Sequence, residues 1–297
     1  VNENVGLLDM SAFAKCIVKG PGAEEWLEYI FANKMPQTIG RISLVHMLSL
    51  NGGVRSEFTV YKTGPQSYYL VSAGAFETHD HDYLFKLAPK DGTVSIQRVT
   101  TQIGVLVLAG PRSRDVLQKL TDTDLSNENF KWLTGRKINV GYASVEALRV
   151  NFVGELGWEL HHPIEMQNYI FDQVMEAGSE FDIKPFGIRA MDSMRLEKSY
   201  RLIPREMSIE YSAYESGLDR FVRLDKENDF IGKKALKDWQ DRGASNGFVT
   251  MEVQGVVDAD ARGSEAIYKN GEVVGRATSG GFGWRCGKSL ALGLVKK

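Results

Sequence analysis

The chain has 297 residues, of which 43% are hydrophobic and 25% are charged, and its formal net charge is −2. This composition is ordinary for a globular protein, and the length is enough for two or three domains. The nearly balanced charge gives no general attraction to nucleic acid or anionic lipid, and no apolar run approaches the length of a membrane-spanning helix.

The ends of the sequence suggest a piece of a longer polypeptide. The chain starts at Val1 with an apolar segment close behind it, and residues 289–295 have the composition of a strand with no closing element. A reading frame with a start and a stop at these ends would contradict this expectation. No signal-peptide pattern opens the chain, and Cys16 and Cys286 lie at opposite ends, so we expect a cytoplasmic or organelle-matrix protein without a disulfide framework.

A strand–Gly-Pro–helix pattern occurs twice. Residues 13–19 form the first predicted strand and end at Gly20-Pro21, while residues 105–108 form the second and end at Gly110-Pro111. Each following segment has an apolar stripe at helical spacing, made by Trp26, Leu27, Ile30 and Phe31 in the first copy and by Val116, Leu117 and Leu120 in the second. Proline in a first helical turn loses no hydrogen bond. The sequence therefore predicts a duplicated α+β element.

Between these two copies, a hairpin carries a candidate functional acid. Residues 43–50 and 56–61 are predicted strands, and the Asn-Gly-Gly turn at 51–53 joins them. Glu57 and Thr59 share one face of the second strand because side chains alternate along a strand. If that face lines a cavity, Glu57 is suited to bind a cationic centre or to remove a proton from an amine. The alternative is an edge strand with a solvated polar face.

A second hairpin, at residues 149–160, presents Glu155 between Gly154 and Gly157. Glycine permits a positive φ and a close backbone approach, so the turn can hold one carboxylate at a rigid corner. Such a carboxylate can accept two parallel N–H bonds from a flat heterocycle with adjacent donors. The alternative is a turn whose acid is merely solvated.

The remaining predicted elements complete an α+β chain with a small β domain at its end. A strand is expected at 68–72 and helices at 77–87, 163–178 and 187–199. From about residue 241 a linker-like segment leads into short strands with glycine turns, including the hairpin signal Asn270-Gly271. We therefore predict two domains, residues 1–240 and 241–297, the second of them incomplete.

Other patterns give no further site. Phe282 stands where a phosphate-binding loop ending in Gly-Lys-Ser at 287–289 needs its first glycine, and a strand is predicted after it. The histidines at 79 and 81, two apart on a predicted helix, and the adjacent pair at 161 and 162 point to different sides. We expect no metal site, and neither a Ser-His-Asp set nor a catalytic cysteine is indicated.

Several motifs together resemble the aminomethyltransferase (glycine cleavage T-protein) family, in the family's order and over essentially the whole chain. They are VGLLDMS (5–11), VKGPGA (18–23), GGV (52–54), LAGP (108–111), VGELGWE (153–159), MDSMRLE (191–197), DFIGKKAL (229–236), VGRATSGG (274–281) and LALG (290–293). Residues 13–15, 153–160 and 195–198 look most like the tetrahydrofolate module at the C-terminal end of dimethylglycine and sarcosine dehydrogenases.

The resemblance implies a fold of two α+β subdomains and a small C-terminal β barrel, here truncated, around a central opening that holds tetrahydrofolate. It implies that Glu155 binds the pterin, whose 2-amino group and ring N–H form a donor pair that matches one carboxylate. Glu57 falls where the family usually has aspartate, beside the folate nitrogens and the one-carbon unit. Thr59 would face the same cavity, and Ser72 would lie beside the edge of the pterin.

Two positions depart from the family pattern. Glu57 has one methylene more than aspartate, and a misplaced carboxylate can cost roughly a hundredfold in rate. Ala190-Met191-Asp192 has methionine where the T-protein has a folate-contacting arginine, which argues against glycine cleavage itself.

The resulting hypothesis is a tetrahydrofolate-dependent one-carbon transferase. It would capture an iminium or formaldehyde unit from a methylated glycine as 5,10-methylenetetrahydrofolate, with a flavin-dependent dehydrogenase domain or subunit as a partner. One alternative is a folate-dependent methyltransferase acting on an O-methyl or sulfonium substrate. Another is a non-catalytic folate-binding protein like the family's iron–sulfur repair members, although neither Cys16 nor Cys286 lies in their Lys-Gly-Cys-Tyr motif.

Overall fold

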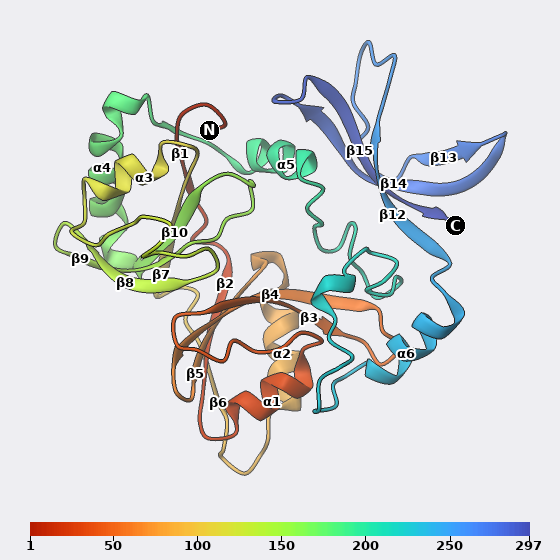
Figure 1. Ribbon diagram of the computed structural model, residues 1–297, viewed down its shortest axis with the longest axis horizontal. Helices are drawn as coiled ribbons and strands as arrows, with labels where there is room; N and C mark the ends of the chain where they lie inside the picture. The colour runs from red at the N-terminus through yellow and green to blue at the C-terminus, as the bar shows by residue number, and fades with distance from the viewer. The chain divides into compact units, whose positions relative to one another are not determined.

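The computed structural model describes residues 1–297, and Figure 1 shows the chain coloured from its N-terminus to its C-terminus. The chain divides into two units that each contain several segments of the sequence. Unit 1 consists of residues 1–23, 36–43 and 59–191, and unit 2 consists of residues 24–35, 44–58 and 192–297.

Helices separate short groups of strands along most of the sequence. The strands are β1 (Gly6–Asp9), β2 (Ala14–Lys19), β3 (Ile42–Leu48), β4 (Val54–Gly64), β5 (Ser67–Ser72), β6 (Ser95–Arg98), β7 (Ile103–Ala109), β8 (Gly135–Val140), β9 (Ala143–Leu148), β10 (Gly157–Pro163), β11 (Lys184–Pro185), β12 (Asn246–Glu252), β13 (Ala266–Lys269), β14 (Glu272–Gly283) and β15 (Lys288–Lys296). The α-helices are α1 (Ala23–Ile30), α2 (Glu77–Leu87), α3 (Ser113–Gln118), α4 (Gln167–Ala177), α5 (Ile188–Glu197) and α6 (Lys233–Arg242). Short 3₁₀ turns are Gly74–Phe76, Ile164–Met166, Ser179–Phe181 and Asp219–Phe221.

Unit 1 contains a six-stranded sheet in the order β11-β1-β7-β10-β9-β8. Its pairs are antiparallel except for β1 with β11. Helices α3 and α4 pack against this sheet (Figure 1), and the core between them is apolar, with Trp158 as its largest fully buried side chain. Burying such an aromatic ring is among the largest single contributions to a core. This sheet supplies the strands that flank the loop of Glu155.

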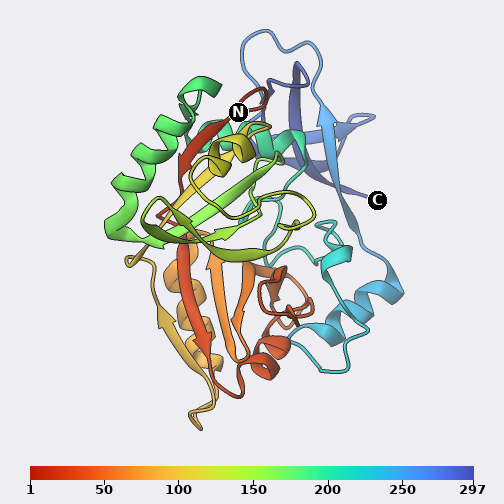
Figure 2. The ribbon, with the colours of Figure 1, turned by 60° about the vertical axis from the view of Figure 1, so that its left-hand side comes forward.

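A five-stranded sheet has the order β3-β4-β5-β2-β6. The boundary between the units falls within β3 and within β4, so only the second half of β4 belongs to unit 1 with β5, β2 and β6. Helix α2 lies along the strands β5 and β2 (Figures 1 and 2). Burial alternates along the first seven residues of β4, as the sequence predicts for a strand with one polar face.

The predicted strand–Gly-Pro–helix pattern is confirmed in both copies, and its turn has the same backbone geometry twice. Gly20 has a φ of 126° and Gly110 a φ of 128°, values that side chains rarely adopt. The carbonyl of Gly20 accepts a hydrogen bond from the N–H of Ala23 at 3.0 Å, and that of Gly110 accepts one from Ser113 at 3.0 Å. The two turns therefore start α1 and α3 in the same way.

The end of the chain forms the four-stranded antiparallel sheet β12-β15-β14-β13 in unit 2. Its small core contains Leu196, Leu290 and Leu292 with Phe248 packed against them. Residues 280–289 run from the end of β14 through a turn into β15, which confirms that no helix follows the Gly-Lys-Ser sequence. The α+β fold with a small C-terminal β domain agrees with the sequence prediction.

Two helices differ from the expectation. The helix expected from Pro163 begins at Gln167, because Pro163 ends β10 and a 3₁₀ turn at Ile164–Met166 comes between them. Helix α6 was not predicted, since only Leu236 is buried among its ten polar-rich residues. None of the helices has both the length and the apolar composition required to cross a bilayer.

Candidate functional site

The loop that carries Glu155 connects β9 to β10 in unit 1, and the side chain of Asn151 braces it from within. Asn151 Oδ1 accepts hydrogen bonds from the N–H groups of Val153 at 3.0 Å and Gly154 at 3.1 Å, and its Nδ2 donates to the carbonyl of Glu155 at 2.8 Å. Gly154 has a φ of 72°, which glycine adopts without strain. The backbone on both sides of Glu155 is therefore fixed, while its side chain stays half-buried.

The same loop is also tied to the start of α3. The carbonyl of Leu156 accepts hydrogen bonds from the N–H of Gly110 at 2.8 Å and from the hydroxyl of Ser113 at 3.1 Å. A Cβ on Gly157 would lie 2.5 Å from the carbonyl oxygen of Leu108, so the close approach expected of this glycine occurs. The loop is held at both ends, which is what precise presentation of one carboxylate requires.

Glu57 lies on β4 in unit 2, where the buried side chain of His46 holds it. Glu57 Oε2 is 2.9 Å from His46 Nε2, and the imidazole ring lies 5.4 Å from the ring of Phe221, measured between centroids. The Glu57 side chain is 24% exposed, whereas that of His46 is 1% exposed. One carboxylate oxygen is thus held inside the protein while the side chain still reaches the surface.

Arg201 adds positive charge near Glu57. Its guanidinium donates to the carbonyls of Ser216 at 3.0 Å, Ser199 at 3.3 Å and Gly217 at 3.1 Å. Burial lowers the pKa of Arg201, and the charges of nearby acids, Glu57 among them, oppose that shift. Arginine keeps its charge in proteins, so Glu57 lies in the field of a fixed cation.

Thr59 and Ser72 belong to unit 1, on β4 and at the end of β5. Thr59 is half-buried. Ser72 is buried, and its hydroxyl donates to Asp80 Oδ2 on α2 at 3.0 Å. The hydrogen of the Ser72 hydroxyl is therefore used in the contact with α2.

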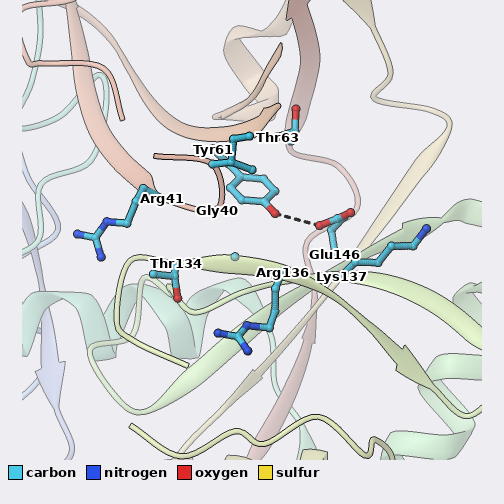
Figure 3. A pocket seen from close by; sticks show the side chains of 10 residues that line it. Gly40, Arg41, Tyr61, Thr63, Thr134, Arg136, Lys137 and Glu146 are labelled. Carbon is cyan, nitrogen blue, oxygen red and sulfur yellow. Dashed lines mark hydrogen bonds between the residues drawn. The ribbon is translucent and has the colours of Figure 1, made fainter. Parts of the chain in front are cut away.

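A groove of about 460 Å³ opens elsewhere in unit 1, beside Tyr61 and Glu146. The Tyr61 hydroxyl donates to Glu146 Oε2 at 3.1 Å, and Figure 3 shows Arg41 and Arg136 directed away from this pair. Burial, reinforced by the charge of Glu146, raises the pKa of Tyr61. None of the four predicted site residues lines this groove, so it is not the site that the sequence predicts.

The histidine pairs point apart, as expected from their spacing. His161 contacts the Tyr69 hydroxyl at 3.0 Å and Glu159 at 3.2 Å, whereas His162 contacts Gln167 at 2.7 Å. On α2, His79 contacts Asp80 at 3.0 Å. No three His, Cys, Asp or Glu side chains are grouped so as to hold a metal ion in residues 1–297.

Three supporting residues were missed by the sequence reasoning: His46, Asn151 and Asp80. His46 is a lone histidine in an apolar strand, joined by a short turn to the strand of Glu57, and pairing across that hairpin is a signal that could have identified it. Asn151 accepts a hydrogen bond from Val153, two residues on, which is the spacing typical of an Asx turn. Asp80 gives no sequence signal, because its contact with Ser72 depends on how α2 packs.

Known proteins match the chain over nearly its whole length. The protein-family model of the GCVT N-terminal domain matches residues 1–226, and the family model of the glycine cleavage T-protein C-terminal barrel domain matches residues 247–297. The chain is 40% identical to mitochondrial dimethylglycine dehydrogenase of Homo sapiens over 99% of its own length and 34% of that protein. It is 31% identical to an aminomethyltransferase of Thermoanaerobacter sp. (strain X514), over 99% of its length and 79% of that protein.

The fold has a counterpart among solved structures. The chain superimposes on the crystal structure of glycine cleavage system aminomethyltransferase T from Bartonella henselae with a TM-score of 0.88 and 23% sequence identity, covering 99% of this chain and 79% of that one. It spans about a third of the length of the dimethylglycine dehydrogenases it matches. With both domain models and the fold in agreement, this chain belongs to the aminomethyltransferase, or glycine cleavage T-protein, family.

Proposed function

We propose that the chain binds tetrahydrofolate and transfers a one-carbon unit to it, giving 5,10-methylenetetrahydrofolate. The observation that carries this proposal is the braced loop of Glu155, with Asn151 bonded to three backbone groups around it. Membership of the aminomethyltransferase family supports the same reaction class.

The residues of the loop fit a reduced pterin. The pterin presents two adjacent N–H donors, and a carboxylate at a fixed position can accept both. Glu155 has its backbone fixed and its side chain half-buried, so little conformational freedom is lost when the acid pairs with such a ligand. When bound, tetrahydrofolate supplies the nitrogen atoms that take up the one-carbon unit. We propose that Ser72 contributes its strand-end backbone and Thr59 its half-buried face to the same site.

Glu57 would stabilise the positive charge that develops in the reaction and would accept a proton. Its carboxylate can stabilise a developing cation on a nitrogen atom or accept a proton from an amine. Electrostatic stabilisation of this kind is worth about 3 kcal/mol for a well-placed group. The charge of Arg201 lies near the same carboxylate.

The buried thiol does not offer a competing chemistry. Cys16 is buried, and desolvation raises the pKa of its thiol to about 12, so it is not the thiolate that a nucleophile requires. Cys286 is exposed in the turn between β14 and β15, where its backbone N–H donates to Glu197 Oε1 at 3.1 Å.

We further propose that the one-carbon unit comes from a methylated glycine, oxidised by a flavin-dependent dehydrogenase domain or subunit. The proposal is supported by the identity of 40% with a dimethylglycine dehydrogenase, of which this chain corresponds to 34%. We also propose a working division into a folate-binding region, residues 1–240, and a β domain, residues 241–297. The matched ranges 1–226 and 247–297 support a boundary there.

Calorimetry with reduced folate tests the binding role of Glu155. We expect Glu155→Gln to weaken binding roughly 10- to 100-fold, because it replaces a charged acceptor and sets an amide N–H₂ against the pterin donors. Glu165→Gln, at an exposed position of the same unit, is the matched control and should bind like the wild type. Equal affinity of wild type and Glu155→Gln would refute the assignment.

Product analysis separates the proposed reaction from demethylation of an O-methyl or sulfonium substrate. With a methylated glycine, a flavin dehydrogenase and tetrahydrofolate, we expect methylenetetrahydrofolate to accumulate. Accumulation of methyltetrahydrofolate would favour the methyltransferase instead.

A further inference from the structure

His46 is a buried histidine with one polar contact, and that contact is the proposed catalytic acid. It lies on β3 with its side chain 1% exposed, and its Nε2 is 2.9 Å from Glu57 Oε2. The other ring nitrogen, Nδ1, is buried and has no hydrogen-bond partner. Phe221 packs against the ring with its plane tilted by 54°, which limits rotation of the imidazole.

These contacts determine where the proton of a neutral imidazole lies. A neutral imidazole has one N–H and one lone pair, and the hydrogen bonds of the two nitrogens select the tautomer. A proton on Nδ1 would be a buried donor without an acceptor, which is costly. A proton on Nε2 is donated to a carboxylate, which gives a charge-assisted hydrogen bond. His46 therefore acts as the donor to Glu57.

We propose that His46 is the positioning residue of Glu57. The inference rests on the proposed function and deepens it. Glutamate has one more rotatable bond than aspartate, so a partly exposed glutamate would sample several rotamers. His46 holds Oε2 of this acid from the buried side, while the Glu57 side chain as a whole is still 24% exposed. The longer acid thus gains from His46 the precision that aspartate has from its shorter chain.

Three substitutions at position 46 test this role. His46→Leu removes the donor, His46→Gln places an N–H₂ near the former Nε2, and His46→Asn places one near the former Nδ1, out of reach of Glu57. We expect Leu and Asn to lower kcat of folate-dependent one-carbon transfer roughly 10- to 100-fold, with the Kd for folate changed less than about threefold. Gln should recover most of kcat, and the Gln–Asn comparison holds even if His46→Leu fails to fold.

A double-mutant cycle distinguishes positioning from a general structural role. In the background Glu57→Gln, adding His46→Asn should lower kcat by less than about twofold, because the residue that it positions has lost its charge. Multiplicative losses would overturn the proposal, as would wild-type kcat in His46→Asn or equal loss in Asn and Gln.

A second readout does not depend on activity. Two-bond ¹H–¹⁵N correlation spectra of the full chain should show His46 as the Nε2–H tautomer, with Nδ1 unprotonated; an Nδ1–H tautomer would overturn the inference. Failure of the proposed function has a different signature. It would appear as wild-type protein that neither binds reduced folate nor transfers a one-carbon unit, whereas failure of positioning alone leaves wild type active, with the Asn and Gln variants equal to wild type or to each other.

Discussion

Lys15 on β2 has its ammonium group almost entirely removed from water. The residue is 2% exposed, and Nζ donates to the carbonyl of Ser11 at 2.8 Å. Desolvation lowers the pKa of Lys15 from 10.5 to about 8, opposed by the charges of Glu77 and Asp9. Below pH 8 the folded chain therefore carries a buried charge, and the unfolded chain holds the same proton more favourably.

The consequence is a contribution to stability that rises with pH. Between about pH 8 and pH 10.5 the unfolded chain binds a proton at Lys15 that the folded chain has lost, so the contribution of Lys15 to the free energy of unfolding increases across this window. We expect the free energy of unfolding of Lys15→Met, taken relative to that of wild type, to fall by roughly 3 kcal/mol from pH 8 to pH 10.5. Urea unfolding of both proteins at a series of pH values measures this difference.

The uncharged substitution Ile17→Met on the same strand is the control for this experiment. Its difference from wild type should not vary with pH, because it changes no titrating group. A difference between Lys15→Met and wild type that is the same at pH 7 and pH 10.5 would contradict the assignment of a buried ammonium to Lys15.

At the scale of elements, the repeated turn before α1 and α3 predicts a large effect from a small substitution. A Cβ on Gly110 would lie 2.5 Å from the carbonyl oxygen of Asn4, in addition to the strain of a φ of 128°. We expect Gly110→Ala to lower the free energy of unfolding by about 3 kcal/mol. Gly92→Ala, with a φ of 80° and no atom within 4 Å of its Cβ, should cost about 1 kcal/mol. Chemical denaturation compares the two, and equal losses would contradict a role for the backbone contact.

Most elements were predictable because their signals are local. The Asn-Gly-Gly turn identified the hairpin of β3 and β4, and the Gly-Pro turns identified the starts of α1 and α3. Helix α6 was not predicted because its sequence is strongly polar and only Leu236 is buried.

The candidate site was predictable to a different extent. Glu155 and Glu57 followed from turn chemistry and from the resemblance to a family. The contact of Asp80 with Ser72 depends on how α2 packs, so no local pattern encodes it, whereas the contact of His46 with Glu57 crosses a hairpin and depends on the register of its two strands.

At the scale of the whole molecule, a buried ionic network in unit 2 joins distant parts of the sequence. Arg195 on α5 donates to Glu206 Oε2 at 3.0 Å and to the hydroxyl of Ser279 on β14 at 2.6 Å, and both charged side chains are 0% exposed. Glu206 Oε1 also accepts from Thr278 at 2.6 Å. This network connects α5 to the C-terminal sheet.

Removing one member of the network should be costly. We expect Arg195→Met to lower the free energy of unfolding by about 3–5 kcal/mol, because Glu206 would remain as a buried charge without its partner. Arg205→Met, which removes a 42% exposed guanidinium 3.5 Å from Asp192, should cost less than about 1 kcal/mol. Thermal or urea unfolding of both variants measures the difference, and a small loss in Arg195→Met would show that Glu206 is stabilised by other means.

The contact between His46 and Glu57 has an evolutionary consequence. Aspartate at position 57, shorter by one methylene, would no longer reach the ring nitrogen of His46, which is 2.9 Å from Glu57 Oε2. Replacing His46 would leave Glu57 without its hydrogen-bond donor. A substitution at either position alone would therefore disrupt the contact. Relatives with aspartate at position 57 should tolerate many residues at position 46. Relatives with glutamate at position 57 should keep histidine, or a hydrogen-bond donor of similar length, at position 46.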